Sequence, residues 1–202
     1  MAARNSTRRP LKLRNAVWAA GLARWLAKAG VSPNQISLAS VAAAAIAGCC
    51  LLRGSYLAAA LFIQLRLLCN LMDGMVAIEG GLRSAAGEIY NDLPDRISDA
   101  LILLAAGYSL AWPAFGRELG WTATLLALMT AYVRTLGGAR GLAQDFRGPM
   151  AKPQRMAAMT AACLLALLDS RAIALALIAI IAGALVTAVL RVRGIILQLE
   201  TR

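Results

Sequence analysis

The sequence predicts an all-α integral membrane protein with six transmembrane helices, preceded by an N-terminal amphipathic helix that lies in the membrane interface. Three observations predict this class. Of the 202 residues, 60% are hydrophobic, and the mean hydropathy is +0.66. Only 15% are charged, which is too few to cover a water-soluble helical domain with so large a core. Hydrophobic runs of about 20 residues, enough to cross ~30 Å of hydrocarbon, recur along the chain.

The first 30 residues form a basic N-terminal segment that contains the amphipathic helix. Residues 10–30 mix apolar and basic side chains at helical spacing, namely Trp18, Leu22, Trp25 and Leu26 with Arg14, Arg24 and Lys28. The segment is too basic to cross a membrane, and it lacks the uninterrupted apolar core and the cleavage site of a signal peptide. We therefore expect a helix that lies along the membrane surface.

Residues 31–202 form the second predicted domain, which holds the six membrane-spanning helices. The hydrophobic runs are Gln35–Leu52, Ser55–Ile78, Glu88–Ala111, Trp121–Gly138, Pro153–Leu168 and Ala172–Leu190. Turn-forming and polar residues separate them, most clearly in the polar stretch 140–152. The four cysteines lie in these runs without the spacing of metal ligands, so we expect them to be packing residues.

The distribution of Lys and Arg predicts that both termini are cytoplasmic. The first 28 residues carry seven basic residues and no acid. With this end inside, only Arg53, Arg117 and Arg171 lie in outer loops, as the preference of basic loops for the cytoplasm requires. The net charge of +11 suits anionic lipid headgroups, so it needs no nucleic-acid partner. We expect a bacterial cytoplasmic membrane to be the location.

Residues 70–99 hold six of the ten acidic residues of this apolar chain. Asn70 and Asp73 share one helical face near the inner end of the second span. Four residues share a face of the third span: Glu88, Asn91, Asp95 and Asp99. The two spans are antiparallel and joined by a short turn at Gly80 and Gly81. We therefore expect the two polar faces to meet just below the cytoplasmic surface.

The residue types in this stretch predict a site for a hard divalent cation. Carboxylate and amide oxygens suit Mg²⁺ or Mn²⁺, and buried acids are costly unless cations or partners neutralise them. The chain has no histidine, so carboxylates must do any acid–base work. Gly74 and Ala77 are small enough to let a backbone or a flat ligand approach. The alternative is a polar contact between helices that binds no ion.

Two charged residues lie deeper in the same spans. Arg66 precedes Asn70 by four residues, and Asp99 follows Asp95 by four residues. We expect Arg66 and Asp99 to form a structural ion pair beneath the site, since breaking a buried pair costs ~3 to 5 kcal/mol.

The spacing of these residues resembles the signature of the CDP-alcohol phosphatidyltransferases, which is DxxDGxxAR, eight residues, then GxxxDxxxD. The chain reads Asn70-x-x-Asp73-Gly74-x-x-Ala77-Ile78, eight residues, then Gly87-x-x-x-Asn91-x-x-x-Asp95. The stretch VSPNQIS at residues 31–37, with Pro33 and Asn34, resembles the start of the first span of that family. Three positions depart from the signature: Asn70 and Asn91 replace the first and third aspartates, and Ile78 replaces the arginine.

The resemblance implies a metal-dependent transfer of a phosphatidyl group from CDP-diacylglycerol, or a similar CDP-lipid, to an alcohol with release of CMP. In the family the signature aspartates hold two divalent metals, and the fourth is also the base. The implied metal ligands are Asp73, Asp95 and the neutral oxygens of Asn70 and Asn91, with Asp95 as the base. The implied contacts of the CDP-lipid are Pro33, Asn34, Gly74, Ala77 and Gly87. The resemblance also implies a homodimer.

The two amides remove two negative charges, so we expect weaker binding of divalent cations and leave open whether one or two bind. Glu88 and Asp92 are candidates to restore charge. We favour Glu88 as a further metal ligand because it shares the face of Asn91, whereas Asp92 is turned by about 100°. The alternative for both is a solvated acid at a helix start, where the helix dipole favours it.

Basic residues follow the polar site along the chain. Arg134, Lys152 and Arg155 lie at or near the inner ends of the fourth and fifth spans. The resemblance implies that they contact a substrate phosphate, and they favour a phosphorylated acceptor over a simple alcohol. The alternative is an ordinary basic cytoplasmic loop. The sequence does not identify the acceptor, which could be glycerol 3-phosphate, another phosphorylated polyol or a simple alcohol.

Two other classes of function remain open. The departures at Asn70, Asn91 and Ile78 suit a catalytically impaired membrane protein that binds CDP-lipid or acts as a scaffold. A carrier or ion pathway also uses acids within a membrane. The absence of broken helices in matched halves of the sequence argues against the carrier.

Overall fold

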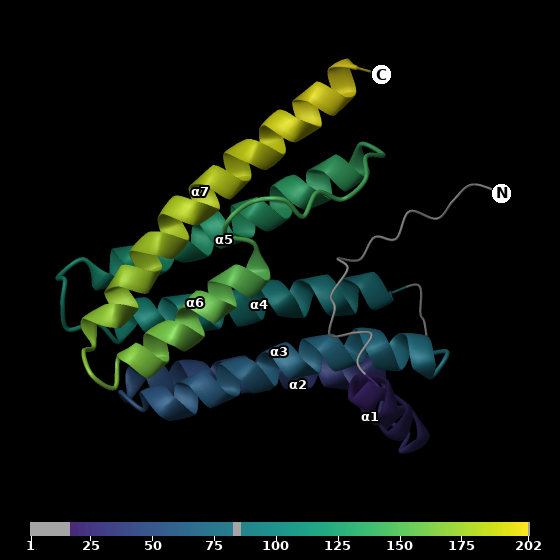
Figure 1. Cartoon of the computed structure of the whole chain (residues 1–202), viewed down its shortest axis with the longest axis horizontal. Coiled ribbons are helices and arrows are strands. Elements are labelled where there is room, and N and C mark those ends of the chain that lie inside the picture. Colours follow the sequence, from purple (N-terminus) through teal and green to yellow (C-terminus); the bar gives the residue numbers. More distant parts are fainter. Residues whose placement is uncertain (1–16, 83–85, 202) are drawn as a thin grey trace. The chain divides into compact units, whose positions relative to one another are not determined.

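The computed structural model describes residues 17–82 and 86–201, in which it contains seven α-helices and no strand (Figure 1). The helices are α1 (Val17–Lys28), α2 (Pro33–Leu52), α3 (Tyr56–Glu79), α4 (Gly87–Tyr108), α5 (Gly116–Ala139), α6 (Lys152–Leu165) and α7 (Arg171–Glu200). The prediction of an all-α protein is therefore confirmed for the described residues.

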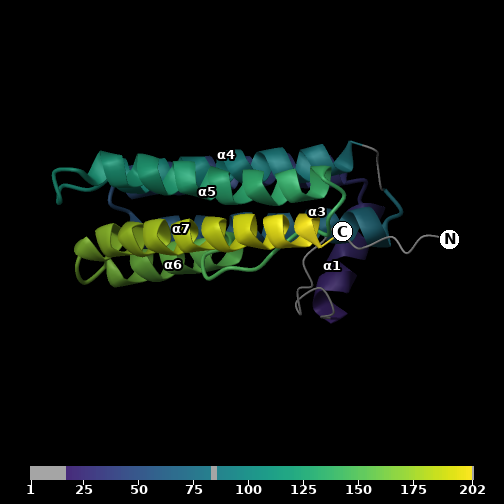
Figure 2. The same ribbon diagram turned by 90° about the horizontal axis from the view of Figure 1, so that it is seen from above.

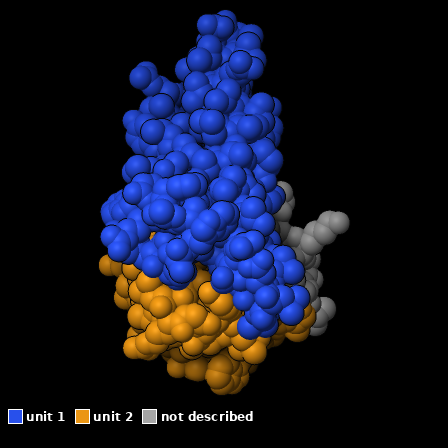
Figure 3. All heavy atoms as spheres, turned by 90° about the vertical axis from the view of Figure 1, so that its left-hand side faces the viewer, with its two compact units in different colours: residues 1–10, 106–202 blue, residues 11–105 orange. Residues whose placement is uncertain are grey.

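The chain divides into two compact units, which Figure 3 colours separately. One unit, residues 11–105, holds α1, α2, α3 and most of α4. The described residues of the other unit are 106–201, and they hold the end of α4 with α5, α6 and α7. We call them the acidic-site unit and the C-terminal unit. The predicted domain boundary after residue 30 stays a prediction.

In the acidic-site unit, α2 and α3 lie side by side, and α1 packs across the C-terminal part of α3 (Figures 1 and 2). Ala19 and Ala23 of α1 are fully buried against residues 71–76 of α3. Trp18 and Trp25 face outward instead, with 54% and 64% of their surface exposed. Exposed tryptophans beside basic residues suit a membrane interface, so this packing supports the predicted role of the amphipathic helix.

Glycines allow the chain to turn after α3. A Cβ atom on Gly80 would lie 2.9 Å from the Cβ of Ala27 in α1 and 2.8 Å from the carbonyl oxygen of Val76. Gly81 has a φ of 64°, which side chains disfavour. The two residues therefore let α1 approach the end of α3 and let the chain reverse toward α4.

In the C-terminal unit, α5 and α7 lie side by side, and α6 packs along α7 (Figure 2). The end of α4 approaches α5 so closely that a Cβ on Gly107 would lie 2.6 Å from the Cα of Gly120. Small residues at this crossing allow backbone-to-backbone packing, as is common between membrane helices.

Three of the described helices, α2, α3 and α7, are long and apolar enough to cross a membrane. They support the prediction of an integral membrane protein. Helix α6 has 14 residues, or about 21 Å at 1.5 Å per residue, and it ends before the predicted limit of Leu168. Helix α7 continues well past the predicted limit of Leu190. The arrangement of six spans stays a prediction.

Candidate active site

Polar contacts between α3 and α4 fix the register of these two helices. The Nδ2 atom of Asn91 donates to Oδ1 and Oδ2 of Asp73 at 3.2 and 3.3 Å. Nη2 of Arg66 lies 2.7 Å from Oδ1 of Asp99. Asp73 and Arg66 are separated by about 10 Å along α3, and Asn91 and Asp99 by about 12 Å along α4. The similar spacings hold the helices antiparallel and place Asp95 at a level between the two contacts.

Arg66 is the buried cation of this cluster. The predicted ion pair between Arg66 and Asp99 is confirmed, and Asp95 joins it, because Nη2 of Arg66 also lies 3.4 Å from Oδ1 of Asp95. The same Nη2 donates to the backbone oxygen of Asp95 at 3.3 Å. Arg66 is 0% exposed, and Asp95 and Asp99 are 5% and 2% exposed. Such burial is tolerated only when opposite charges and hydrogen bonds compensate it.

Ser37 of α2 brings a third helix to the site. Its hydroxyl group donates to Oδ2 of Asp73 at 2.7 Å, and Asp73 is only 3% exposed. Sequence reasoning missed this residue, although it ends the VSPNQIS stretch. The available signal was a serine one helical turn beyond Pro33, inside an otherwise apolar span.

The preceding residues start the helix that carries Ser37. Ser32 caps α2, since its hydroxyl accepts from the backbone N–H of Gln35 at 3.3 Å, while Oε1 of Gln35 accepts from the N–H of Ser32 at 2.9 Å. Pro33 and Asn34 occupy the first turn, where a proline loses no helical hydrogen bond. A contact of either residue with a CDP-lipid stays a prediction.

Helices α3 and α4 also carry the small residues predicted to contact the CDP-lipid and the three residues that depart from the family signature. Gly74 and Ala77 are buried in α3 beside Asp73, and Gly87 begins α4. Asn70 is partly buried, whereas Ile78 is 44% exposed. The structure brings Asp73 and Asn91 into contact, and it places Asp95 beside Arg66, one helical turn after Asn91. The ligand-binding roles of the small residues stay predictions.

The structure describes the side chain of only one of the two acids, Asp92 and Glu88, that were expected to restore negative charge at the site. Oδ1 of Asp92 lies 3.4 Å from Nη2 of Arg96 one turn later, and its side chain is 45% exposed. This arrangement supports the alternative of a solvated acid for Asp92. The side chain of Glu88 lies outside the described residues, so its role as a metal ligand stays a prediction.

The donor set fits a hard divalent cation. Among the described residues no three side chains of His, Cys, Asp or Glu gather as a metal site. Asp73 and Asp95 supply carboxylate oxygens, and Asn70 and Asn91 carry amide oxygens on the same two helices. Asn91 contacts Asp73 through Nδ2, and its Oδ1, the atom with which an amide binds a cation, is on the other branch of the side chain. Ligation of a metal by Asn91 stays a prediction. Oxygen donors of this kind match Mg²⁺ or Mn²⁺ rather than softer metals.

In the C-terminal unit, two buried arginines meet at Thr130 of α5. Nη1 of Arg155 donates to Oγ1 of Thr130 at 3.3 Å and to the carbonyl oxygen of Met150 at 3.0 Å. Nη1 of Arg191 donates to the carbonyl oxygen of Thr130 at 2.7 Å. Arg155 and Arg191 are 2% and 4% exposed. Arg191 was not among the predicted site residues, because its position past the last hydrophobic run resembled an ordinary basic loop.

The other predicted basic residues lie around the loop between α5 and α6. The guanidinium of Arg134 stacks over the ring of Phe146, 5.4 Å from its centroid. Lys152 is the first residue of α6 and is partly buried. Their contact with a substrate phosphate stays a prediction.

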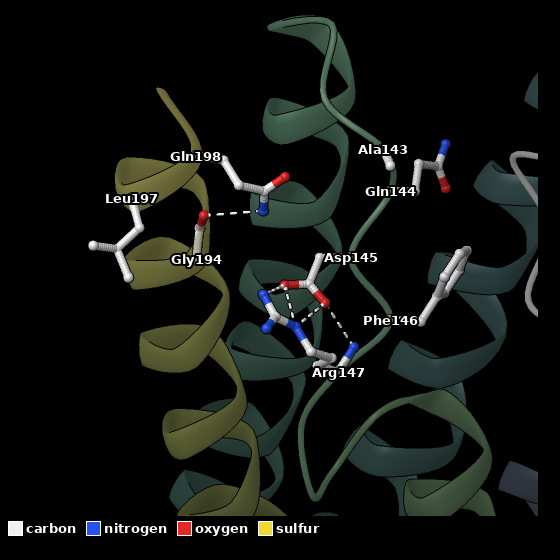
Figure 4. A pocket seen from close by; sticks show the side chains of 8 residues that line it. All are labelled: Ala143, Gln144, Asp145, Phe146, Arg147, Gly194, Leu197 and Gln198. Atoms are coloured by element: carbon white, nitrogen blue, oxygen red, sulfur yellow. Dashed lines mark hydrogen bonds and ion pairs between the residues drawn. The ribbon is translucent and has the colours of Figure 1, made fainter. Parts of the chain in front are cut away.

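A hollow of about 850 Å³ lies between this loop and the C-terminal part of α7 (Figure 4). Asp145 and Arg147 form an ion pair of 2.9 Å on its wall. Burial raises the pKa of Asp145, but hydrogen bonds and charge from Arg147 outweigh it and lower that pKa below its usual value.

The fold and the site together define a helical membrane protein with a buried oxygen-donor site shared by neighbouring helices. The chain belongs to the CDP-alcohol phosphatidyltransferase family, whose sequence profile matches residues 30–191. The resemblance noted in the signature spacing is therefore confirmed.

Two curated relatives are phosphatidylinositol phosphate synthases. The protein from Mycobacterium marinum is 31% identical over 142 residues, which are 67% of this chain and 59% of the relative. The protein from Mycolicibacterium smegmatis is 29% identical over 135 residues, which are 64% and 60% of the two chains. The matched region thus spans about three fifths of the length of these relatives.

Solved structures share the fold. The crystal structure of the Mycobacterium tuberculosis phosphatidylinositol phosphate synthase with CDP-DAG bound superposes with a TM-score of 0.79 at 20% identity, and covers 89% of this chain and 94% of that one. The structure of the same synthase with manganese and citrate gives a TM-score of 0.78 at 19% identity, with 88% of each chain covered. Apolar helices and the match to this membrane enzyme family together suggest an integral membrane protein.

Proposed function

We propose that the chain transfers a phosphatidyl group from CDP-diacylglycerol, or a similar CDP-lipid, to an alcohol and releases CMP. The observation that carries this proposal is the hydrogen-bonded contact of Asn91 with Asp73, one helical turn from the buried Asp95. It brings three of the family's signature positions together from two helices. The bound CDP-DAG and manganese in structures of the Mycobacterium tuberculosis relative support the same donor and the same kind of metal.

Each residue of the site has a proposed role. Asp95 takes the proton from the acceptor hydroxyl, whose oxygen then attacks the lipid-side phosphorus, and CMP leaves with the bonding electrons. Asp73, Asp95 and the amide oxygens of Asn70 and Asn91 would hold Mg²⁺ or Mn²⁺, with Glu88 as a further ligand. The metal would polarise the phosphate oxygens and offset their negative charge. Arg66 holds Asp95 in place from α3.

The acceptor that we propose is a phosphorylated alcohol. Buried Arg155 and Arg191 meet at Thr130, and Arg134 and Lys152 add positive charge to the same unit. Guanidinium groups bind phosphate oxygens through paired hydrogen bonds. The curated relatives are named for a product that keeps a phosphate on its head group, which supports the same choice.

The finer topology and assembly belong to this proposal as well. Six spans follow from the hydrophobic runs, and two cytoplasmic termini follow from the placement of basic residues. The location that we propose is a bacterial inner membrane. Homodimer formation follows from the family resemblance alone.

The direct test is CMP release from CDP-diacylglycerol with a panel of alcohols and their phosphorylated forms. We expect release that requires Mg²⁺ or Mn²⁺, stops with EDTA and is fastest with a phosphorylated acceptor. Asp95→Asn should lower the rate by about 10²-fold or more, because a general base contributes 10² to 10⁴. Asp92→Asn is the matched control and should retain activity, since Asp92 pairs with Arg96 at the surface.

An absence of CMP release with every alcohol would contradict the proposed transferase. If such a protein still bound CDP-diacylglycerol, the alternative of a CDP-lipid-binding or scaffold protein would replace it.

A further inference from the structure

We propose that the site binds one divalent cation per chain, and that Arg66 supplies the positive charge that a second cation would otherwise bring. The inference rests on the proposed function, because it concerns the metal that this function requires. It assigns Arg66 a role as a permanent internal cation of the site.

The buried charged groups of α3 and α4 have a net charge that one divalent cation neutralises. Among the described buried side chains of α3 and α4, Asp73, Asp95 and Asp99 carry three negative charges and Arg66 carries one positive charge, so their sum is two negative charges. Asp92 does not enter this balance, because it is exposed and paired with Arg96. One divalent cation neutralises the cluster. A second would leave two uncompensated positive charges among buried groups, which is costly.

Arg66 lies between the carboxylates of Asp95 and Asp99. Its Nη2 atom lies 2.7 Å from Oδ1 of Asp99 and 3.4 Å from Oδ1 of Asp95, so it occupies the space in which a cation bridging these carboxylates would lie. The side chain is fully buried, and its Nε and Nη1 atoms have no hydrogen-bond partner among the described residues. Its charge is therefore directed mainly at the two carboxylates.

The carboxylate of Asp73 is stabilised by hydrogen bonds from neutral side chains. Two neutral donors contact its carboxylate: the amide Nδ2 of Asn91 and the hydroxyl of Ser37, which is 2.7 Å away. Hydrogen bonds to an ionised carboxylate stabilise it without any added cation. An aspartate in place of Asn91 would instead set two carboxylates against each other and require further positive charge between them.

The test counts Mn²⁺ ions bound to the purified full-length chain in nanodiscs of zwitterionic lipid, by isothermal titration calorimetry and electron paramagnetic resonance. We expect one tightly bound Mn²⁺ per chain. Asn70→Asp combined with Asn91→Asp should raise the number to two, since it adds two negative charges. Asp92→Asn should leave the number at one, because Asp92 pairs with Arg96 outside the site.

A second set of variants tests the role of Arg66 through a residue that the proposal does not place on the metal. Asp99→Asn leaves Asp95 as the carboxylate that pairs with Arg66. Arg66 then competes with the cation for Asp95, so we expect Mn²⁺ to bind about tenfold more weakly or worse. Combining Asp99→Asn with Arg66→Met removes both charges and should restore the affinity. The circular dichroism spectrum of both variants should show the same helix content as the wild type. The number of Mn²⁺ ions bound by the wild-type chain is measured independently of these variants.

Two Mn²⁺ ions on the wild-type chain would overturn this inference and leave the proposed transferase intact. Equal Mn²⁺ affinity in the wild type and Asp99→Asn would overturn the role of Arg66. A wild-type chain that binds no Mn²⁺ would overturn the proposed metal-dependent function together with the inference.

Discussion

At the residue scale, Asp73 depends on side chains from two other helices. Ser37 of α2 and Asn91 of α4 both donate to its carboxylate. The contact with Asn91 was predictable, because helical spacing and a short turn oblige the polar faces of two antiparallel neighbours to meet. The contact with Ser37 was not, because nothing in local spacing sets the rotation of α2 against α3. Arg191 escaped prediction for the same reason, since its acceptors at Thr130 and Arg147 are distant in sequence.

Ser37→Ala should destabilise the protein by about 1 to 3 kcal/mol, because it leaves a buried carboxylate without one of its donors. Thermal unfolding in detergent measures the effect, and Mn²⁺ titration should show weaker binding. Ser40→Ala is the control, since the hydroxyl of Ser40 donates to the carbonyl oxygen of Ser37 on its own helix, and no other hydrogen bond of this hydroxyl is found among the described residues. Equal stabilities of the two variants would contradict the role of Ser37.

At the element scale, hydropathy located the helices but not all of their ends. Helix α5 begins at Gly116, ahead of the predicted Trp121, because its first turns pack through Gly116 and Gly120 rather than through large apolar residues. Helix α7 continues past Leu190 because Arg191 is satisfied by carbonyl oxygens inside the unit. A sequence profile counts these glycines and arginines as breaks, although tertiary contacts make them part of the helices.

Helix α4 contains a proline, a residue that local helix propensity disfavours inside a helix. Pro94 lies inside the helix, directly before Asp95 and between the contacts made by Asn91 and Asp99. Proline within a helix removes one backbone hydrogen bond and favours a kink.

The crossing of α4 and α5 gives a prediction about packing. Gly107→Ala should lower the thermal stability, because the added Cβ would lie 2.6 Å from the Cα of Gly120 and 2.7 Å from the oxygen of Gly116. Overpacking of this kind costs about 1 to 3 kcal/mol. Gly21→Ala in α1 is the control, since among the described residues no atom beyond its neighbours and its own helix backbone would lie within 4 Å of the added Cβ. This variant should be neutral or stabilising. A variant at Gly107 as stable as the wild type would refute this close approach.

At the scale of the whole molecule, large apolar side chains face outward on both units. Leu61, Leu125 and Leu175 are each at least 60% exposed, which a lipid environment explains and water does not. Composition alone predicted this, because 60% of the residues are hydrophobic and only 15% are charged. The number of spans is harder to predict. Helices α4, α5 and α6 carry charged residues such as Asp95, Arg134 and Arg155, and they are not among the described helices that are long and apolar enough to cross a membrane.

The predicted topology can be tested with single cysteines in a chain whose four natural cysteines are replaced. Ser55 begins the second predicted span at its outer end, and Ser170 lies in a loop predicted to be outside. Ser55→Cys and Ser170→Cys should therefore react with a membrane-impermeant maleimide in intact cells. Gln144→Cys should react only after the membrane is opened. Labelling of Gln144→Cys in intact cells would contradict cytoplasmic termini.

The central claim is that α3 and α4 hold a divalent cation between oxygens of Asp73 and Asp95. An experimental structure of the Mn²⁺-loaded chain, with the ion located by its anomalous scattering, tests this most directly. We predict one peak at about 2.1 Å from a carboxylate oxygen of each aspartate. A peak that touches neither residue, or none at saturating Mn²⁺, would contradict the account.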